Sequence, residues 1–321
     1  MFFGFDDDQL AFRDAVRDLL DKECPPEAVR AAWDAAAGAL DRGVWDRLAD
    51  MGVLAACVPE PGGGLGLDEQ ALVLVLEETG RAALPHPIVE TAAVAAPLVG
   101  AGAGMVASNL GGPHVACAAD ADRLLLHDAG ANALHVVDRA AVGLTAVETV
   151  DRARRAATVD WQRTRATLVT DDPAAVELAV DRGAFGAAAQ LVGLGQRMLD
   201  KTVAYVAERH QFGVPVGSFQ AVKHHLADAL EKLAFARPAV YRAAHSLATG
   251  AETRARDVSM AKAMASDAAR FAGRRALQCH GAIGYTVEHD LHLYLKRTWA
   301  LAAAWGDAAW HRDRVGAAIG I

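Results

Sequence analysis

The second half of this chain is a succession of long helical patterns, and this limits the possible folds more than any other feature. Apolar residues recur every three or four positions along four segments, at residues 174–210, 218–250, 256–279 and 290–317. In the first segment this spacing places Phe185, Val192 and Leu199 on one face. Because only short connections separate the segments, we expect them to pack as an antiparallel four-helix bundle.

The rest of the chain divides into a second helical region and a short region rich in strands. Apolar residues recur at helical spacing near the N-terminus, as at Leu10, Val16 and Leu20. The pattern then changes to short β-rich runs at residues 124–126, 134–137 and 166–169. We therefore predict a mainly α-helical fold with three domains. These are an N-terminal helical domain at residues 1–104, a small middle β domain at residues 105–172 and the C-terminal bundle at residues 173–321.

Composition excludes several classes of protein. The 321 residues are 53% hydrophobic and 22% charged, as in ordinary folded proteins, and the formal net charge is -8. We do not expect such an acidic chain to bind nucleic acid or an anionic membrane surface. The four cysteines lie far apart and form no CxxC pair, which argues against a zinc site or a disulfide framework. Because the N-terminus also lacks a secretory pattern, we expect the protein in the cytoplasm.

Two features that resemble ligand sites have simpler interpretations. The glycine-rich run at residues 62–66 lacks the Lys-Ser or Lys-Thr of a phosphate loop and the flanking pattern of a dinucleotide fingerprint, so we interpret it as a connection between helices. His280, His289 and His292 lie close together in the sequence. Transition-metal sites need three or four converging ligands with supporting residues, and nothing else in the sequence supplies them. We therefore predict no metal site.

Two short segments point to a specific chemistry. Residues 209–220 (RHQFGVPVGSFQ) end one long helix, turn through two glycines and a proline, and open the next helix with Ser218 as its expected N-cap. Residues 278–285 (QCHGAIGY) end a later helix in small residues that let a ligand approach the backbone. In this order, together with residues 59–66 and 288–297, they resemble the acyl-CoA dehydrogenases. The resemblance implies an N-terminal helical domain, a middle β domain, a C-terminal four-helix bundle, and FAD bound at a subunit interface.

The same resemblance assigns individual residues to the FAD. Arg209 matches the arginine that pairs with the FAD pyrophosphate, and Gln211 and Phe212 lie beside it. Gln220 matches a glutamine near the adenosine half. The loop along the pyrophosphate and ribitol is matched by Gln278, Gly281 and Ala282, of which Ala282 replaces a common glycine. A guanidinium and amide groups suit a dianionic diphosphate because they donate several charge-assisted hydrogen bonds.

The chain departs from the family pattern in two places. Its middle β domain is shortened, and it lacks the Thr-Glu-Pro, Gly-Ser-Asp and Trp-Ile-Thr segments that shelter the flavin ring and the thioester in full-length members. The family also uses a glutamate to take the α-proton of the thioester, at positions that fall near Gly306 and near Gly183. The carboxylates nearby are Asp307 and Asp181, each one methylene shorter than glutamate. The sequence therefore identifies no catalytic base.

With these two departures, the chain resembles the smaller subunit of the two-gene acyl-CoA dehydrogenases of actinobacteria, which form α2β2 heterotetramers. The resemblance implies that a larger partner supplies the glutamate, the thioester pocket and the flavin-ring contacts, while this chain lends its arginine and glutamine groups to the shared FAD. The expected reaction is the α,β-desaturation of an acyl-CoA, in such pairs often a steroid-derived one, with electrons passed to an electron-transfer flavoprotein. Two alternatives stay open, namely a self-sufficient homo-oligomer that uses Asp307 or Asp181 as its base, and a non-catalytic scaffold subunit.

Overall fold

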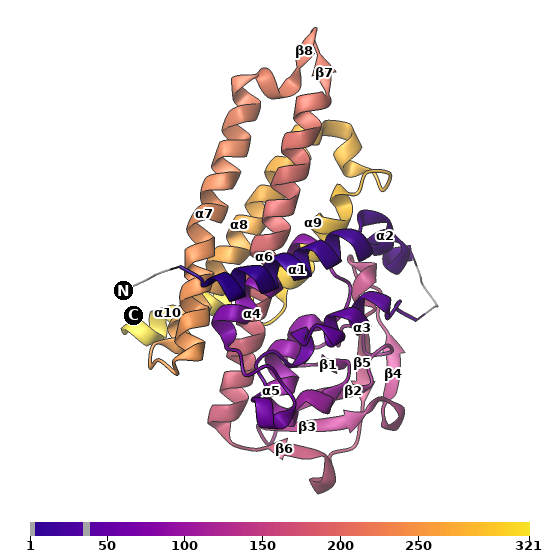
Figure 1. Ribbon diagram of the computed structural model, residues 1–321, viewed down its shortest axis with the longest axis vertical. Helices are drawn as coiled ribbons and strands as arrows, with labels where there is room; N and C mark the ends of the chain where they lie inside the picture. The colour runs from indigo at the N-terminus through magenta and orange to yellow at the C-terminus, as the bar shows by residue number, and fades with distance from the viewer. Residues whose placement is uncertain (1–3, 35–38) are drawn as a thin grey trace.

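The computed structural model describes residues 4–34 and 39–321, and most of them are helical, as the sequence predicted (Figure 1). Residues 1–3, which belong to the N-terminal segment considered for a secretory signal, lie outside the described part. Within the described ranges, no helix is both long enough and apolar enough to cross a lipid bilayer. The long C-terminal helices run along the longest axis of the molecule, and the N-terminal helices and sheets pack against one half of that length (Figure 1).

The N-terminal region is built from short helices, and side-chain caps fix the starts of two of them, α1 and α4. Its elements are α1 (Asp7–Glu23), α2 (Pro26–Asp34), α3 (Gly43–Asp50), η1 (Val53–Ala55), η2 (Glu60–Gly62), α4 (Glu69–Arg81), the π-helix η3 (Val89–Ala95), α5 (Ala96–Val99) and η4 (Ala101–Ala103). Asp6 and Gln9 form a capping box at the start of α1, and the Asp68 carboxylate accepts backbone N–H groups at the start of α4. The glycine-rich run is tightly packed, because a β-carbon at Gly64 would lie 2.1 Å from the carbonyl oxygen of Val58. This packing explains its glycine without any ligand.

The middle region holds a four-stranded sheet and a separate hairpin. The sheet has the order β1-β2-β3-β6, formed by β1 (Val106–Ser108), β2 (Arg123–Asp128), β3 (Ala133–Asp138) and β6 (Leu168–Thr170). β1 is parallel to β2, and the other neighbours are antiparallel. The hairpin pairs β4 (Gly143–Ala146) with β5 (Ala157–Asp160). The short turns between strands are η5 (Arg139–Ala141), η6 (Arg152–Arg154) and η7 (Arg165–Thr167). Residues 124–126 and 134–137 lie in β2 and β3 as predicted, whereas the strand predicted over residues 166–169 begins only at Leu168, after η7.

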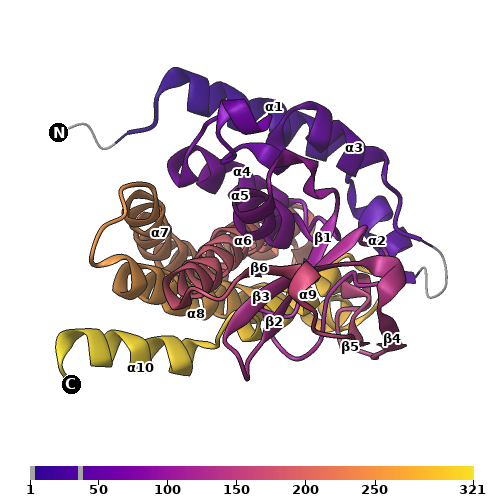
Figure 2. The ribbon, with the colours of Figure 1, turned by 90° about the horizontal axis from the view of Figure 1, so that it is seen from below.

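The C-terminal region consists of three long helices and two shorter ones. They are α6 (Pro173–Glu208), α7 (Gln220–Ala248), α8 (Arg254–His280), α9 (Leu291–Ala303) and α10 (Ala308–Ile319), joined by β7 (His210–Gln211), β8 (Val214–Pro215), η8 (Val216–Ser218) and η9 (Gly281–Tyr285). α10 lies alongside α8 (Figure 2).

Two details of the predicted bundle are wrong. The continuous helix predicted over residues 290–317 is broken, because Trp305 and Gly306 adopt positive φ angles of 59° and 84°, which a right-handed helix does not contain. Ser218 does not cap the second long helix either. That helix, α7, begins at Gln220 after Phe219, and the Ser218 hydroxyl instead donates to the carbonyl oxygen of Pro215.

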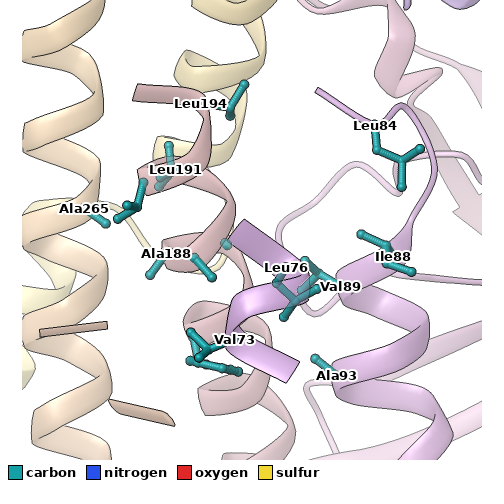
Figure 3. Packing of buried hydrophobic residues seen from close by; sticks show 14 of the residues in the cluster. Val73, Leu76, Leu84, Ile88, Val89, Ala93, Ala188, Leu191, Leu194 and Ala265 are labelled. Carbon is teal, nitrogen blue, oxygen red and sulfur yellow. The ribbon is translucent and has the colours of Figure 1, made fainter. Parts of the chain in front are cut away.

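The hydrophobic core is centred on α6, which packs against α4, η3, α7 and α8. Buried side chains of these elements meet in Figure 3, among them Val73, Leu76, Val89, Ala188 and Leu191. Burying a side chain of the size of Leu or Val stabilises a fold by about 1.5–3 kcal/mol, so this meeting point contributes strongly to folding.

Two glycines let the backbones of α4 and α6 touch. A β-carbon at Gly80 would lie 2.2 Å from the carbonyl oxygen of Gln190, and one at Gly193 would lie 1.9 Å from the carbonyl oxygen of Glu77. Both obstacles are backbone atoms, which cannot move aside as a flexible side chain does. Only glycine fits at these two positions.

We expect Gly193→Ala to lower the free energy of unfolding by roughly 2 kcal/mol, because overpacking outweighs the higher helix propensity of alanine. Urea denaturation of the purified chain measures the change. Gly102→Ala is the matched control, since a β-carbon at Gly102 would meet no atom within 4 Å and the residue has an ordinary φ of -78°. Equal stability of the two variants would contradict the close approach of α4 and α6.

Candidate functional site

A cavity of about 860 Å³ lies at the end of the bundle where α6, α7 and α8 approach the β7–β8 turn (Figure 1). Its walls come from the last turn of α6, the first turns of α7, and the last turn of α8 with η9. Five of the residues that the sequence assigns to FAD line it together, namely Arg209, Gln211, Gln278, Gly281 and Ala282. Two motifs that are far apart in the chain therefore meet at one cavity.

Arg209 is held in place by its backbone and leaves its side chain exposed. It follows the last residue of α6 with extended φ and ψ angles of -71° and 118°. Its N–H donates to the Tyr205 carbonyl oxygen at 2.9 Å, and its own carbonyl accepts the N–H of Val216 at 2.7 Å. Among the described residues no carboxylate forms an ion pair with Arg209, unlike the many arginines of this chain that are paired. Its guanidinium is therefore available to an anion from outside the chain.

The opposite wall is the end of α8. Gln278 is exposed in its last turn, and Gly281 ends the helix with a φ of 65°. This positive φ favours glycine, and a β-carbon at Gly281 would face open space. The glycine of the motif is therefore explained by its backbone conformation beside the cavity, and the Ala282 that follows it is exposed as well.

Tyr205 and His280 form a stacked wall of the cavity that the sequence analysis missed. Their rings lie 4.4 Å apart at an interplanar angle of 18°. His280 Nδ1 donates to the carbonyl oxygen of Ala276 at 2.8 Å. Burial lowers the pKa of His280, and the neighbouring His289 and Lys201 lower it further, so this ring stays neutral at neutral pH. The spacing offered a signal for Tyr205, because it lies in the last turn of the helix that Arg209 terminates, four residues before it.

Two of the predicted FAD residues do not line the cavity. Phe212 is 92% exposed at the tip of the β7–β8 turn, where its ring meets the edge of Phe219 with centroids 6.2 Å apart. Gln220 is the exposed first residue of α7, next to the lining residue Ala221. Both residues are neighbours of lining residues in the sequence, but neither lines the cavity itself.

The electrostatic character of the cavity suits an anion. Arg209 is its strongest cation, and no carboxylate lines it in the part of the chain that the structure describes. The amide side chains of Gln211 and Gln278 add hydrogen-bonding groups on two walls. A guanidinium with amides is the donor set that binds diphosphate well, and the volume is that of a typical ligand site. The residues present therefore fit the diphosphate of a dinucleotide.

Asp181, one of the two candidate bases, is an ion-paired residue in the bundle. It is completely buried on α6 and accepts from Arg254 Nε at 2.8 Å and from Arg314 Nη1 at 2.9 Å. Both carboxylate oxygens are thus engaged, one by α8 and one by α10. Asp181 joins three helices.

Asp307, the other candidate base, caps a helix. Its carboxylate accepts the backbone N–H of Trp310 at 2.9 Å at the start of α10. This hydrogen bond is the main cause that lowers the pKa of Asp307 below its ordinary value, although burial opposes it. A general base works best with a pKa near the working pH, so the environment of Asp307 shifts it in the unfavourable direction.

The three histidines near the end of α8 are packed as rings. The His280 and His289 rings meet edge to face at 4.7 Å, and His292 packs against Trp33 at 5.1 Å. Across residues 4–34 and 39–321, no group of three or more His, Cys, Asp or Glu side chains is arranged to hold a metal ion.

We expect Asp181→Asn to lower the free energy of unfolding by about 3 kcal/mol, because it leaves two partly buried arginines without their charged partner. Glu177→Gln is the matched control, since Glu177 pairs with the same Arg254 and Arg314 but is 51% exposed. The control is expected to change stability by less than about 1 kcal/mol. Urea denaturation of both variants tests this, and an unchanged Asp181→Asn chain would count against the structural role.

Stability is expected to fall in acid through His311, whose ring donates from Nε2 to the carbonyl oxygen of Trp305 at 2.9 Å. Burial lowers the pKa of His311 from 6.5 to about 4, so the folded chain favours the neutral ring. The resulting stabilisation is complete above pH 6.5 and is lost as the pH falls towards 4. The control is His311→Gln, whose side chain keeps a donor but does not titrate. Between pH 7.5 and 5, we expect the free energy of unfolding of the native chain to fall by about 2 kcal/mol more than that of His311→Gln. Parallel losses in urea titrations of both proteins would refute this.

Two family models match the chain. The acyl-CoA dehydrogenase N-terminal domain matches residues 6–105, and the acyl-CoA dehydrogenase C-terminal domain matches residues 174–320. A relative from Mycolicibacterium smegmatis, "Acyl-CoA dehydrogenase IpdE2", is 34% identical over 92% of this chain and 93% of that protein.

Solved structures share the fold. The ChsE4-ChsE5 complex from Mycobacterium tuberculosis contains a chain that matches with a TM-score of 0.87 at 23% identity, over 100% of this chain and 99% of that one. The Tcur3481-Tcur3483 steroid ACAD matches with a TM-score of 0.85 at 24% identity, over 98% of both chains. The likeness extends over the whole length, and the predicted fold is confirmed. The chain belongs to the acyl-CoA dehydrogenase family of flavoprotein oxidoreductases, and its cofactor is FAD.

Proposed function

We propose that this chain is a subunit of an FAD-dependent acyl-CoA dehydrogenase that desaturates an acyl-CoA thioester between its α- and β-carbons. The cavity around Arg209 holds the diphosphate of an FAD whose flavin ring lies in a larger partner subunit, within an α2β2 assembly. One observation carries the proposal. Arg209 and Gln278 converge on a cavity that is lined by no carboxylate of the described residues, while Asp181 and Asp307 are both engaged within the chain.

The residues of this chain then act by binding rather than by proton transfer. FAD, when bound, accepts a hydride from the β-carbon of the substrate. Arg209 neutralises the charge of the diphosphate through charge-assisted hydrogen bonds, and Gln278 and Gly281 border the same anion from α8. Removal of the α-proton needs a carboxylate within hydrogen-bond reach. The carboxylate of Asp181 is ion-paired with two arginines, and that of Asp307 accepts a backbone N–H. We therefore assign this base to the partner.

The relatives support a heteromeric assembly. Two structures with this fold are described as the ChsE4-ChsE5 complex and as a Tcur3481-Tcur3483 steroid ACAD. From them we extend to this chain a larger homologous partner and a steroid-derived acyl-CoA. A further structure with this fold is described as an electron transferring flavoprotein, and we propose that such a flavoprotein takes the electrons. The four cysteines are unpaired, which suits a reducing cytoplasm.

Co-expression with a larger acyl-CoA dehydrogenase homologue from the same genome tests the subunit role. We expect the two chains to purify together with bound flavin and to oxidise an acyl-CoA, and the isolated chain to do neither. An isolated chain that carries a full complement of flavin and turns over would instead support the self-sufficient homo-oligomer. A complex that never shows flavin absorbance would support the scaffold alternative.

Arg209→Ala in the co-expressed complex tests the cavity itself. Loss of a charge-assisted contact costs about 1.5–3 kcal/mol, so we expect FAD to bind roughly 10–100-fold more weakly and flavin to be lost on dialysis. Arg165→Ala is the control, because Arg165 is an exposed arginine of η7, outside the cavity. Unchanged flavin retention in Arg209→Ala would count against the assignment, and an equal loss in both variants would point to a general charge effect.

A further inference from the structure

The loop between α9 and α10 holds a tryptophan in a strained conformation. Trp305 is 2% exposed, and its φ of 59° is in the left-handed region, which costs a bulky residue about 1–3 kcal/mol. Hydrogen bonds fix the loop. The Trp305 N–H donates to Gly111, the Trp305 carbonyl accepts from His311, and the Gly306 carbonyl accepts from Lys262 Nζ, each at 2.9 Å. Such a strained residue persists only where its surroundings determine it fully.

The indole ring occupies a slot walled by glycines. A β-carbon at Gly183 on α6 would lie 2.1 Å from two carbon atoms of the Trp305 ring, and one at Gly111 would lie 3.0 Å from the indole nitrogen. The wall at Gly183 tolerates no side chain while the indole is present, and the wall at Gly111 leaves little room for one. A glutamate at Gly183 would collide with the ring.

The slot lies where the resemblance places the chemistry. Gly183 and Gly306 mark the two positions near which the family carries its glutamate. The Trp305 ring packs against Gly183, and Trp305 directly precedes Gly306 in the sequence. A carboxylate that removes a proton must lie about 3 Å from that proton. With a base at either position, the α-carbon of the thioester would have to lie in the slot that the Trp305 ring fills.

Among the described residues, a cavity next to the indole is very small. The adjoining cavity, lined by Trp305, Glu90, Cys117, Gln190 and Arg297, has a volume of about 30 Å³. This is the share of one water molecule in the liquid, far less than an acyl chain needs.

We infer that Trp305 is a built-in plug that fills this chain's own acyl pocket, so that the chain binds no acyl-CoA thioester itself. This inference rests on the proposed function, in which the thioester binds to the partner. The plug and the Arg209 cavity are well separated. Lys262 contacts the Trp305 loop, and Cys279 lines the Arg209 cavity. These two residues are 17 positions apart on α8, which corresponds to about 25 Å along the helix. The chain thus has an open nucleotide end and a closed substrate end.

Removal of the plug tests the inference. The probe is butyl-CoA, a thioether analogue of an acyl-CoA that cannot be oxidised, titrated calorimetrically into the full-length purified chain. We expect no saturable binding by the native chain and binding of about one equivalent by Trp305→Gly, which also relieves the positive φ. Trp305→Leu serves as a second, more conservative variant in case the glycine variant does not fold, and it is expected to gain saturable binding that the native chain lacks.

A double variant is the matched control. Adding Gly183→Leu to Trp305→Gly refills the slot from the opposite wall, so the gained binding is expected to disappear. Saturable binding by the native chain overturns the inference, and so does a folded Trp305 variant that gains none. Either result leaves flavin retention by the co-expressed complex untouched. Conversely, a complex without flavin refutes the proposed function but does not alter the titration of the isolated chain.

Discussion

The close packing of α6 against its neighbours is the constraint on which the rest of this structure depends. Four of its glycines face atoms less than 3 Å from a hypothetical β-carbon, on Trp305 for Gly183, Val89 for Gly186, Glu77 for Gly193 and Leu233 for Gly195. Each glycine costs about 1 kcal/mol of helix propensity, which the closer packing of neighbouring elements offsets. Because α6 is clamped along its length, it holds Asp181 and Gly183 near its start and delivers Arg209 directly after its end.

This arrangement separates two tasks within one polypeptide. At one end of the bundle, Arg209 and two glutamine side chains line a large cavity to which no described residue contributes a carboxylate, an arrangement that suits an anionic ligand. Near the start of α6, both carboxylate oxygens of Asp181 and the backbone of Trp305 have partners within the chain. The polar groups of the first region are open to a ligand from outside the chain, whereas those of the second are satisfied within it.

Sequence periodicity and motifs predicted the mainly helical fold, and they named five of the residues that line the cavity. They did not predict the break after α9, because Ala304 to Asp307 reads as an ordinary continuation until Trp305 adopts its positive φ. That conformation follows from tertiary hydrogen bonds to Gly111, His311 and Lys262, which no local pattern contains. The buried pairing of Asp181 was hidden for the same reason, since its two arginines lie 73 and 133 positions away.

The exposed turn at Phe212 affects the solubility of the free chain. Its phenyl ring is almost fully exposed at the end of a narrow projection, on a backbone whose φ of 53° costs energy. Exposed Val214 and Phe219 extend this apolar projection. In the free chain this projection is an exposed apolar surface, and such surfaces favour aggregation.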